Sequence, residues 1–242
     1  MRLGAAWLCA LALAGCSPRA PRGPASACPG ASACTLEGWT AARARLEALR
    51  GRAGGARTER IALTVREPTT GKTIEARGAV AVRPPDDLRM ILVGPGGTTA
   101  LDVWVHEDRY RLAVPALDLV RKGSLRDPPE TRRGLPIDFL RGWLLRPASG
   151  ELLWHARAGS ADRFTLRDEG AVVEVTARDD GRVEAHRRGA FEETLEAEKI
   201  GCGAARYRQR TRLGLEVGIR CEGLEPGPPL DRAFVDPEAA TR

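Results

Sequence analysis

The chain has 242 residues, with 38 Lys and Arg against 32 Asp and Glu and a formal net charge of +6 at neutral pH. Basic and acidic residues alternate along it, and no basic run carries interleaved aromatic side chains, so we expect no nucleic-acid partner. The length suits one domain of ordinary size with a hydrophobic core.

The first sixteen residues have the pattern of an export signal. One positive charge at Arg2 precedes an almost uncharged run, which Leu13-Ala14-Gly15-Cys16 closes. A transmembrane helix needs about 20 apolar residues, so this shorter run fits a signal-peptide core instead. Its end resembles the lipobox of bacterial lipoproteins, in which a peptidase cuts before the cysteine and the thiol carries a diacylglycerol. We therefore expect residues 1–15 to be removed and Cys16 to be the site of lipid attachment, including a palmitate-type acyl chain.

Two other interpretations of this segment remain. Ala12-Leu13-Ala14 would also serve as an ordinary A-x-A cleavage site that releases a soluble protein, and an uncleaved anchor is the third possibility. Ser17, rather than Asp, follows the cysteine, which by analogy with enteric bacteria is typical of sorting to the outer membrane. The sequence thus predicts a protein anchored by lipid to the periplasmic face of the outer membrane.

The cysteines fit an oxidising compartment, where disulfides are permitted. Of six, Cys9 would leave with the signal and Cys16 would carry the lipid. The other four allow three pairings, and proximity in the sequence favours Cys28 with Cys34 and Cys202 with Cys221. A metal site would need clustered ligands, whereas the three histidines are scattered, so we expect neither a metal nor a cofactor.

The sequence divides into a tether, a domain and a tail. Residues 16–34 are rich in Pro, Ala, Gly and Ser and contain few large apolar side chains, which indicates a tether between membrane and domain. The domain should span residues 35–225, and residues 226–242 form a Pro/Gly-rich tail. Apolar residues recur at helical spacing from Leu36 to Arg50, which predicts a helix with Thr35 as its N-cap.

From residue 57 the apolar period changes to two. Alternating runs separated by turns predict an antiparallel meander over residues 57–114, and a polar loop follows at 123–134. Residues 135–145 should form a second helix with Pro136 in its first turn, and more strands follow up to residue 219. The predicted fold is mainly β: about ten or eleven antiparallel strands in one curved sheet, closed on one side by two helices.

No motif points to catalysis. The sequence contains no G-x-S-x-G, H-E-x-x-H or Walker loop. Gly94-Pro95-Gly96-Gly97 lacks the third glycine and the surroundings of a dinucleotide site, so it is interpreted as a turn. The acidic pairs Asp179-Asp180 and Glu192-Glu193 are interpreted as ordinary solvated charge at turns and strand edges. We expect no enzyme.

Two segments carry a family resemblance: GLPIDFLRGWLLRP at residues 134–147, and the strand, turn and next strand predicted over residues 88–101. The first is similar, in shortened form, to the G-x-P-[IL] to L-R-x-W stretch of LolB, the outer-membrane lipoprotein receptor of the LolA/LolB family, and the second is similar to that family's strand, turn and next strand. The likeness spans residues 36–219. It implies an unclosed half-barrel with a helical lid, holding acyl chains of lipoproteins that a LolA-like periplasmic carrier delivers.

The resemblance also assigns a cavity and a membrane-facing turn. The turn would be Gly94 to Gly97, where Gly96 replaces the exposed leucine that delivers cargo in the family. Periodicity does not separate a lipid cavity from a packed core. The apolar residues expected to line the cavity or its lid are Trp39, Leu92, Leu101, Val103, Leu112, Phe139, Leu140 and Trp143.

Two functions follow from this sequence. In the first, a monomeric, membrane-anchored lipoprotein binds acyl chains of lipids or lipoproteins in an apolar half-barrel, in outer-membrane lipoprotein localisation or lipid transport. In the alternative, a structural or envelope-assembly lipoprotein has a solid core and binds a protein partner on its outer face.

Overall fold

The computed structural model describes residues 35–66, 71–132, 135–210 and 214–239. The expected signal peptide, the lipid site at Cys16, the tether and the pairing of Cys28 with Cys34 lie outside these residues.

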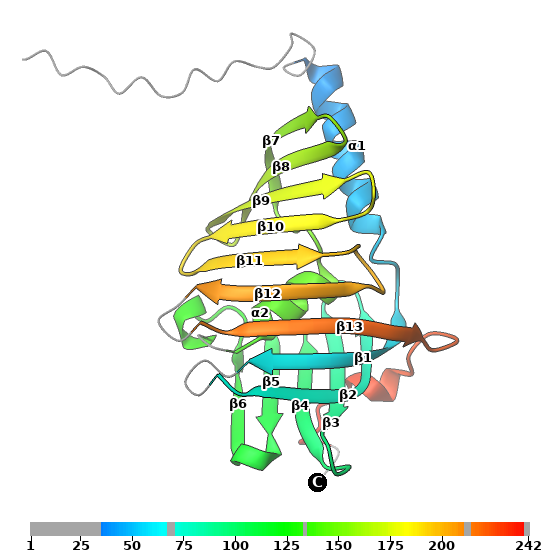
Figure 1. The fold of residues 1–242 in the computed structure, drawn as a ribbon, viewed down its shortest axis with the longest axis vertical. Coiled ribbons are helices and arrows are strands. Elements are labelled where there is room, and N and C mark those ends of the chain that lie inside the picture. The colour runs from blue at the N-terminus through cyan, green and yellow to red at the C-terminus, as the bar shows by residue number, and fades with distance from the viewer. Residues whose placement is uncertain (1–34, 67–70, 133–134, 211–213, 240–242) are drawn as a thin grey trace, which may run out of the picture.

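A single antiparallel sheet dominates the described part of the chain (Figure 1). Thirteen strands pair in the order β6-β5-β4-β3-β2-β1-β13-β12-β11-β10-β9-β8-β7. Within the described residues β6 and β7 each pair with one strand, so the sheet has two edges and forms an unclosed half-barrel. β7 lies at one end of the long axis of the molecule and β2 to β6 lie at the other. The strands are β1 (Arg57–Arg66), β2 (Thr73–Arg83), β3 (Asp87–Val93), β4 (Thr99–His106), β5 (Arg109–Val114), β6 (Leu119–Ser124), β7 (Glu151–Ala158), β8 (Ala161–Asp168), β9 (Ala171–Arg178), β10 (Val183–Arg188), β11 (Glu192–Ala197), β12 (Ala204–Arg210) and β13 (Glu216–Leu224).

The first helix confirms the spacing and capping prediction. α1 spans Leu36–Gly51, and the Thr35 side chain accepts a hydrogen bond from the Gly38 backbone N–H at 3.1 Å. Its buried residues, Ala42, Leu46 and Leu49, contribute to the core. At its end Arg50 donates to the carbonyls that precede β7, which fixes the helix beside that edge strand.

The second helical segment is more irregular than predicted. α2 covers only Ile137–Leu140, and a π-helical turn continues it over Arg141–Leu145. Gly142 is a weak helix former, and Pro147 disfavours the α conformation at Arg146. The helix therefore ends with a hydrogen bond between residues five apart, from the Arg146 N–H to the Arg141 carbonyl at 3.1 Å. We call residues 137–145 the lid segment. Short 3-10 helices cover Pro115–Leu117, Pro129–Arg132 and Asp231–Phe234.

The structure has more strands than the ten or eleven expected. The strand with no apolar signal is β6, whose residues LVRKGS do not alternate and are all partly or fully exposed. It is an edge strand, and among the described strands β5 is its one partner. No buried face therefore imposes the period of two from which strands are predicted.

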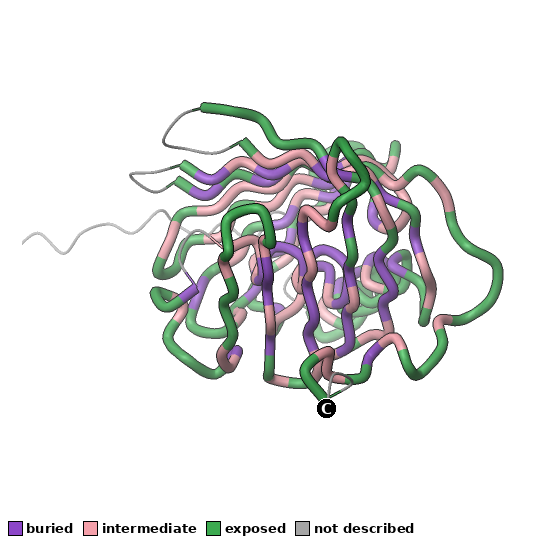
Figure 2. Tube along the Cα trace, turned by 90° about the horizontal axis from the view of Figure 1, so that it is seen from below, coloured by how far each residue is buried: buried purple, intermediate pink, exposed green. Residues whose placement is uncertain are grey.

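The core lies on the inner face of the sheet, under α1 and the lid segment. Buried positions alternate with exposed ones along most strands, and Figure 2 shows the buried positions gathered inside the curve. On the outer face, the segment after β13 returns to cover β4: the Trp104 indole N–H donates to the Phe234 carbonyl at 2.8 Å, and Phe234 is buried. None of the helices in the described ranges combines the length and apolarity that crossing a bilayer requires.

The predicted bridge between Cys202 and Cys221 is present, with 5.0 Å between the Cα atoms. It joins the loop before β12 to β13 and closes the base of that hairpin. Replacing both cysteines by serine should lower the free energy of unfolding by about 3 kcal/mol, because the 19-residue separation sets the loop entropy that the unfolded chain regains. Urea unfolding of the double variant, beside wild type with and without reductant, measures this. Equal stability of oxidised wild type and the double variant would contradict it.

Candidate functional site

An apolar cavity of about 120 Å³ lies between the lid segment and the inner face of the sheet. Phe139 and Trp143 line it from the lid, and the Phe139 ring stacks on Tyr207 with 4.7 Å between the ring centroids. We call this space the inner cavity. The apolar residues that line it from the sheet and the adjoining loop are Val173, Val175, Val183, Ala185, Leu195, Ile200 and Tyr207.

The structure brings two of the eight expected cavity residues, Phe139 and Trp143, to this space. Trp39 is partly buried and packs against the core. The other five, which belong to the packed core, are Leu92, Leu101, Val103, Leu112 and Leu140. The inner cavity is smaller than the roughly 300–1,000 Å³ of pockets that enclose drug-sized ligands. It therefore holds a few carbon atoms of a chain while the lid segment is in this position.

A polar opening of about 210 Å³ adjoins the inner cavity and shares Asp138, Arg187 and Glu193 with it. We call this opening the polar mouth. Oppositely charged side chains line it in pairs. The Arg132 Nε lies 3.1 Å from both Asp138 carboxylate oxygens, and the Arg187 guanidinium lies 2.7 Å from Asp168. Because Arg132 is only 3% exposed, its pairing with Asp138 fixes the start of the lid against the loop before it.

Glu193, which was expected to carry ordinary solvated charge, is instead the most buried carboxyl of the polar mouth. The Tyr207 hydroxyl donates to its Oε1 at 2.5 Å, and Arg187 lies 3.4 Å away. Burial raises the pKa of the Glu193 carboxyl, and these two partners offset part of the rise. Burial and the adjacent Glu193 charge also raise the pKa of the Tyr207 hydroxyl. The sequence did contain a signal for this burial. Glu193 is two residues from Leu195 on β11 and Arg187 is two residues from Ala185 on β10, so each lies on the inward-facing side of its strand.

The raised pKa of Glu193 predicts a pH-dependent cost to folding. Between its ordinary pKa and the raised one, the folded chain holds a proton that the unfolded chain has lost, so stability falls as pH rises through this window. Glu193→Gln should remove this fall and stabilise the fold at neutral pH, because the amide carries no charge whose burial costs free energy. Each tenfold difference in proton affinity between the folded and unfolded chains corresponds to about 1.4 kcal/mol. Urea unfolding from pH 4 to 8 measures it. Glu192→Gln, at the exposed neighbour, is the control, and identical pH profiles for both variants would contradict the assignment.

Polar contacts hold the lid segment at its other end. The Arg57 guanidinium lies 2.6 Å from the Glu59 carboxylate and donates to the Leu144 carbonyl at 3.4 Å. Arg146, which follows the lid, pairs with Asp86 and donates to the Pro85 carbonyl at 3.1 Å. The lid is thus joined to the sheet by these polar contacts and by buried apolar side chains such as Ile137, Leu140 and Leu144. Turns of π-helix, such as the one that ends the lid, are found frequently at functional sites.

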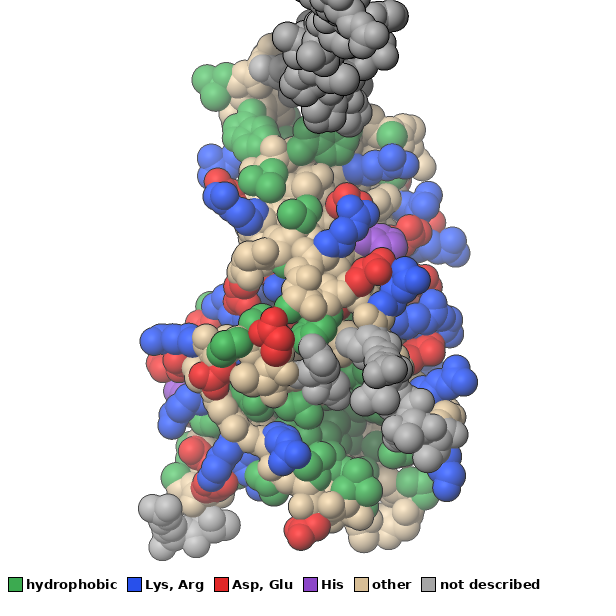
Figure 3. Space-filling view, turned by 90° about the vertical axis from the view of Figure 1, so that its left-hand side faces the viewer, with side chains coloured by type: hydrophobic (Ala, Val, Ile, Leu, Met, Phe, Trp, Pro, Cys, Tyr) green, Lys and Arg blue, Asp and Glu red, His purple; other side chains and the backbone are tan. Residues whose placement is uncertain are grey.

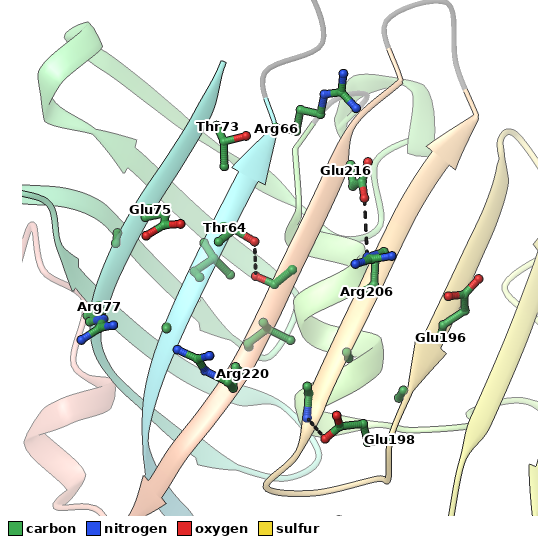
Figure 4. Close-up of a pocket in the computed structure, with 18 of the residues that line it drawn as sticks. Thr64, Arg66, Thr73, Glu75, Arg77, Glu196, Glu198, Arg206, Glu216 and Arg220 are labelled. Atoms are coloured by element: carbon green, nitrogen blue, oxygen red, sulfur yellow. Dashed lines mark hydrogen bonds and ion pairs between the residues drawn. The ribbon is translucent and has the colours of Figure 1, made fainter. Parts of the chain in front are cut away.

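A wider hollow of about 710 Å³ lies on the opposite, outer face of the sheet (Figure 4). Its floor contains small residues such as Ala62, Thr64 and Gly218. Glutamates and arginines also line the hollow, among them Glu216 and Arg206, whose side chains lie 3.6 Å apart. This outer hollow is open and charged, in contrast to the inner cavity.

The Gly94–Gly97 segment is a turn between β3 and β4, closed by hydrogen bonds from Gly94 N–H to the Thr98 carbonyl and from Gly97 N–H to the Gly94 carbonyl. Gly96 and Gly97 have φ angles of +100° and +78°, which residues other than glycine adopt rarely. No group of three or more His, Cys, Asp or Glu residues within the described ranges is arranged to hold a metal ion.

Neither a family model nor a curated protein matches the sequence. Solved structures match the fold. A LolA superfamily protein from Nitrosomonas europaea superposes with a TM-score of 0.54 at 12% identity, covering 81% of this chain and 97% of that one. A putative outer membrane lipoprotein-sorting protein domain from Vibrio parahaemolyticus gives 0.50 at 15% identity, covering 81% and 95%. The chain has a LolA-like fold. The likeness concerns the fold and does not single out LolB.

Proposed function

We propose that the chain is a membrane-anchored periplasmic lipoprotein that binds an acyl chain of a lipid or lipoprotein in the inner cavity. The observation that carries the proposal is an apolar cavity, lined by Phe139 and Trp143, that opens beside a polar mouth. An amphipathic ligand needs both parts: the cavity takes apolar carbon atoms, and the mouth accommodates a polar group beside Arg187 and Glu193.

A full acyl chain requires the lid segment to move away from the sheet. Each methylene transferred from water to an apolar site contributes about 0.8 kcal/mol. This gain acts against the contacts that Arg57, Arg132 and Arg146 make and against the burial of lid side chains such as Leu140 and Leu144. We propose that the lid segment moves as a unit when these contacts break. The inner cavity is then the point at which the end of the chain enters.

The role we propose is LolB-like and without catalysis: lipid attachment at Cys16, location at the periplasmic face of the outer membrane, and receipt of cargo from a LolA-like carrier by a monomer. The lipobox pattern of residues 13–16 supports the anchor, and the LolA-like fold supports the binding site.

Filling the inner cavity tests the binding site. Ala185 lines the cavity and is partly buried, so Ala185→Leu should occupy space that three carbon atoms of the ligand would use. We expect binding of a fluorescent fatty-acid probe to weaken by about 50-fold, from about 0.8 kcal/mol for each of three carbons, with little change in stability.

Ala62→Leu is the matched control, because it adds the same group to a strand at the outer hollow. It should leave probe affinity unchanged. If both variants bind the probe as wild type does, the acyl chain does not use the inner cavity.

One observation favours the alternative, a packed envelope-assembly lipoprotein with a protein partner: the outer hollow is larger than the inner cavity and lined by charges of both signs. In that case wild type would bind no acyl probe. Charge reversal at Arg206 and Glu216 would then affect the cellular role, whereas Ala185→Leu would not.

A further inference from the structure

Edge strand β7 carries two large apolar side chains that the fold leaves in solvent. Leu153 is 43% exposed and Trp154 is 45% exposed, although they are neighbours in a strand. In regular pairing, adjacent side chains point to opposite faces of a sheet, so one of the two would be expected in the core. Their joint exposure therefore needs a local cause.

A β-bulge supplies that cause. Leu152 pairs with Leu166 of β8, whereas Trp154 pairs with the next residue, Thr165, which leaves Leu153 as the extra residue. Leu152 and Leu166 are buried, and His155 faces the inner side, where its ring lies 4.9 Å from the Phe164 ring. The bulge keeps these inner contacts and turns both Leu153 and Trp154 outward.

Strand β7, which carries these side chains, lies at the end of the molecule where α1 begins (Figure 1). Figure 3 shows hydrophobic side chains gathered at this end, and Leu36, the first residue of α1, is 82% exposed. An ion pair joins the helix to the sheet near this end: the Arg45 guanidinium lies 3.4 Å from the Asp162 carboxylate at the start of β8. The chain therefore presents Leu36, Leu153 and Trp154 at one end of its long axis.

We infer that this end, formed by Leu36, Leu153 and Trp154 and here called the apolar end, rests on the surface of a lipid bilayer. The inference depends on the anchor at Cys16 in the proposed function. Eighteen residues, 17–34, separate Cys16 from Thr35, and such a chain spans at most about 65 Å. The anchor thus joins the domain at the apolar end and keeps that end within this distance of the membrane.

The chemistry favours a bilayer over a second protein strand. A bulge interrupts the regular row of backbone groups that an added strand would need, and the bulge at Leu153 lies within β7, at the third of its eight residues. Tryptophan beside aliphatic side chains is typical of the membrane interface. The glycine turn between β3 and β4 is separated from β7 by eight strands of the sheet, so membrane contact is assigned to β7 and α1 rather than to that turn.

Site-specific quenching tests this orientation. The full-length lipidated protein would carry a polarity-sensitive dye on an azide-bearing residue at position 153, or at position 120 as the matched control. Val120 is 46% exposed and lies on β6, the other edge strand. In vesicles of phosphatidylethanolamine and phosphatidylglycerol, iodide should quench the dye at position 153 severalfold less than the dye at position 120. Trp154→Glu in the same labelled chain should remove this protection.

Equal quenching at the two positions of vesicle-bound protein would overturn the orientation and leave the anchor standing. Protein that does not float with vesicles would overturn both. Protection at position 153 accompanied by a dimer in cross-linking would assign the apolar end to a second copy and overturn the membrane contact. Acyl-probe binding is measured separately, so its loss would overturn the cavity proposal alone.

Discussion

Replacement of Arg57 by methionine is expected to lower the free energy of unfolding by about 3–5 kcal/mol, because it leaves a buried carboxylate without its partner. Glu59 is 2% exposed and lies 2.6 Å from the Arg57 guanidinium. The same guanidinium donates to the Leu144 carbonyl, so the variant should also loosen the end of the lid segment. Urea unfolding gives the stability, and hydrogen exchange of the amides after Leu144 reports the lid.

Arg60→Met is the matched control, three residues along the same strand. Arg60 pairs with Glu225 at 3.1 Å, but the two side chains are 61% and 44% exposed, and exposed ion pairs contribute about 0–1 kcal/mol. A loss of similar size in both variants would show that burial of Glu59 does not determine the energy.

Trp143→Ala should cost about 3–5 kcal/mol, the range for truncating a buried aromatic side chain. Trp143 is 5% exposed, belongs to the hydrophobic core and lines the inner cavity. The same variant should bind the fluorescent fatty-acid probe more weakly, because it removes one wall of that cavity. Thermal or urea unfolding and a probe titration measure the two effects on one preparation.

Trp154→Ala is the control for Trp143, since the same substitution on the edge strand removes a side chain that is 45% exposed. It should cost less than about 1 kcal/mol, as expected for a surface position. A small loss for Trp143→Ala with unchanged probe binding would mean that the lid segment neither packs nor covers a site as described.

The fold was predictable where one face of a helix or strand is buried in the core and the other is exposed to solvent. Helical spacing and the Thr35 cap identified α1, and alternation identified the paired strands and the hairpin that Cys202 and Cys221 close. The same rule failed at β6, which has no buried face to impose alternation. At the lid segment the apolar pattern located the helix, but having no single period it did not reveal that a short α-helix is followed by a π-turn.

The site was predictable only in its apolar half. Phe139 and Trp143 were identified from the lid motif, whereas Glu193 and Tyr207 meet because β11 and β12 pair in a register that the sequence does not reveal. Glu59 was missed for a related reason. It falls in phase with inward-facing Ile61, and its role is evident only once Arg57 is seen to reach it from the same strand.

The most direct test of acyl-chain binding is mass spectrometry of the protein purified from bacterial membranes, recorded under native and denaturing conditions. We expect a covalent lipid mass at Cys16 in both spectra. We also expect an additional non-covalent lipid in the native spectrum alone, strongly reduced in Ala185→Leu and retained in Ala62→Leu. A native spectrum of wild type with no lipid beyond the covalent anchor, obtained without detergent exchange, would contradict binding of an acyl chain in the inner cavity.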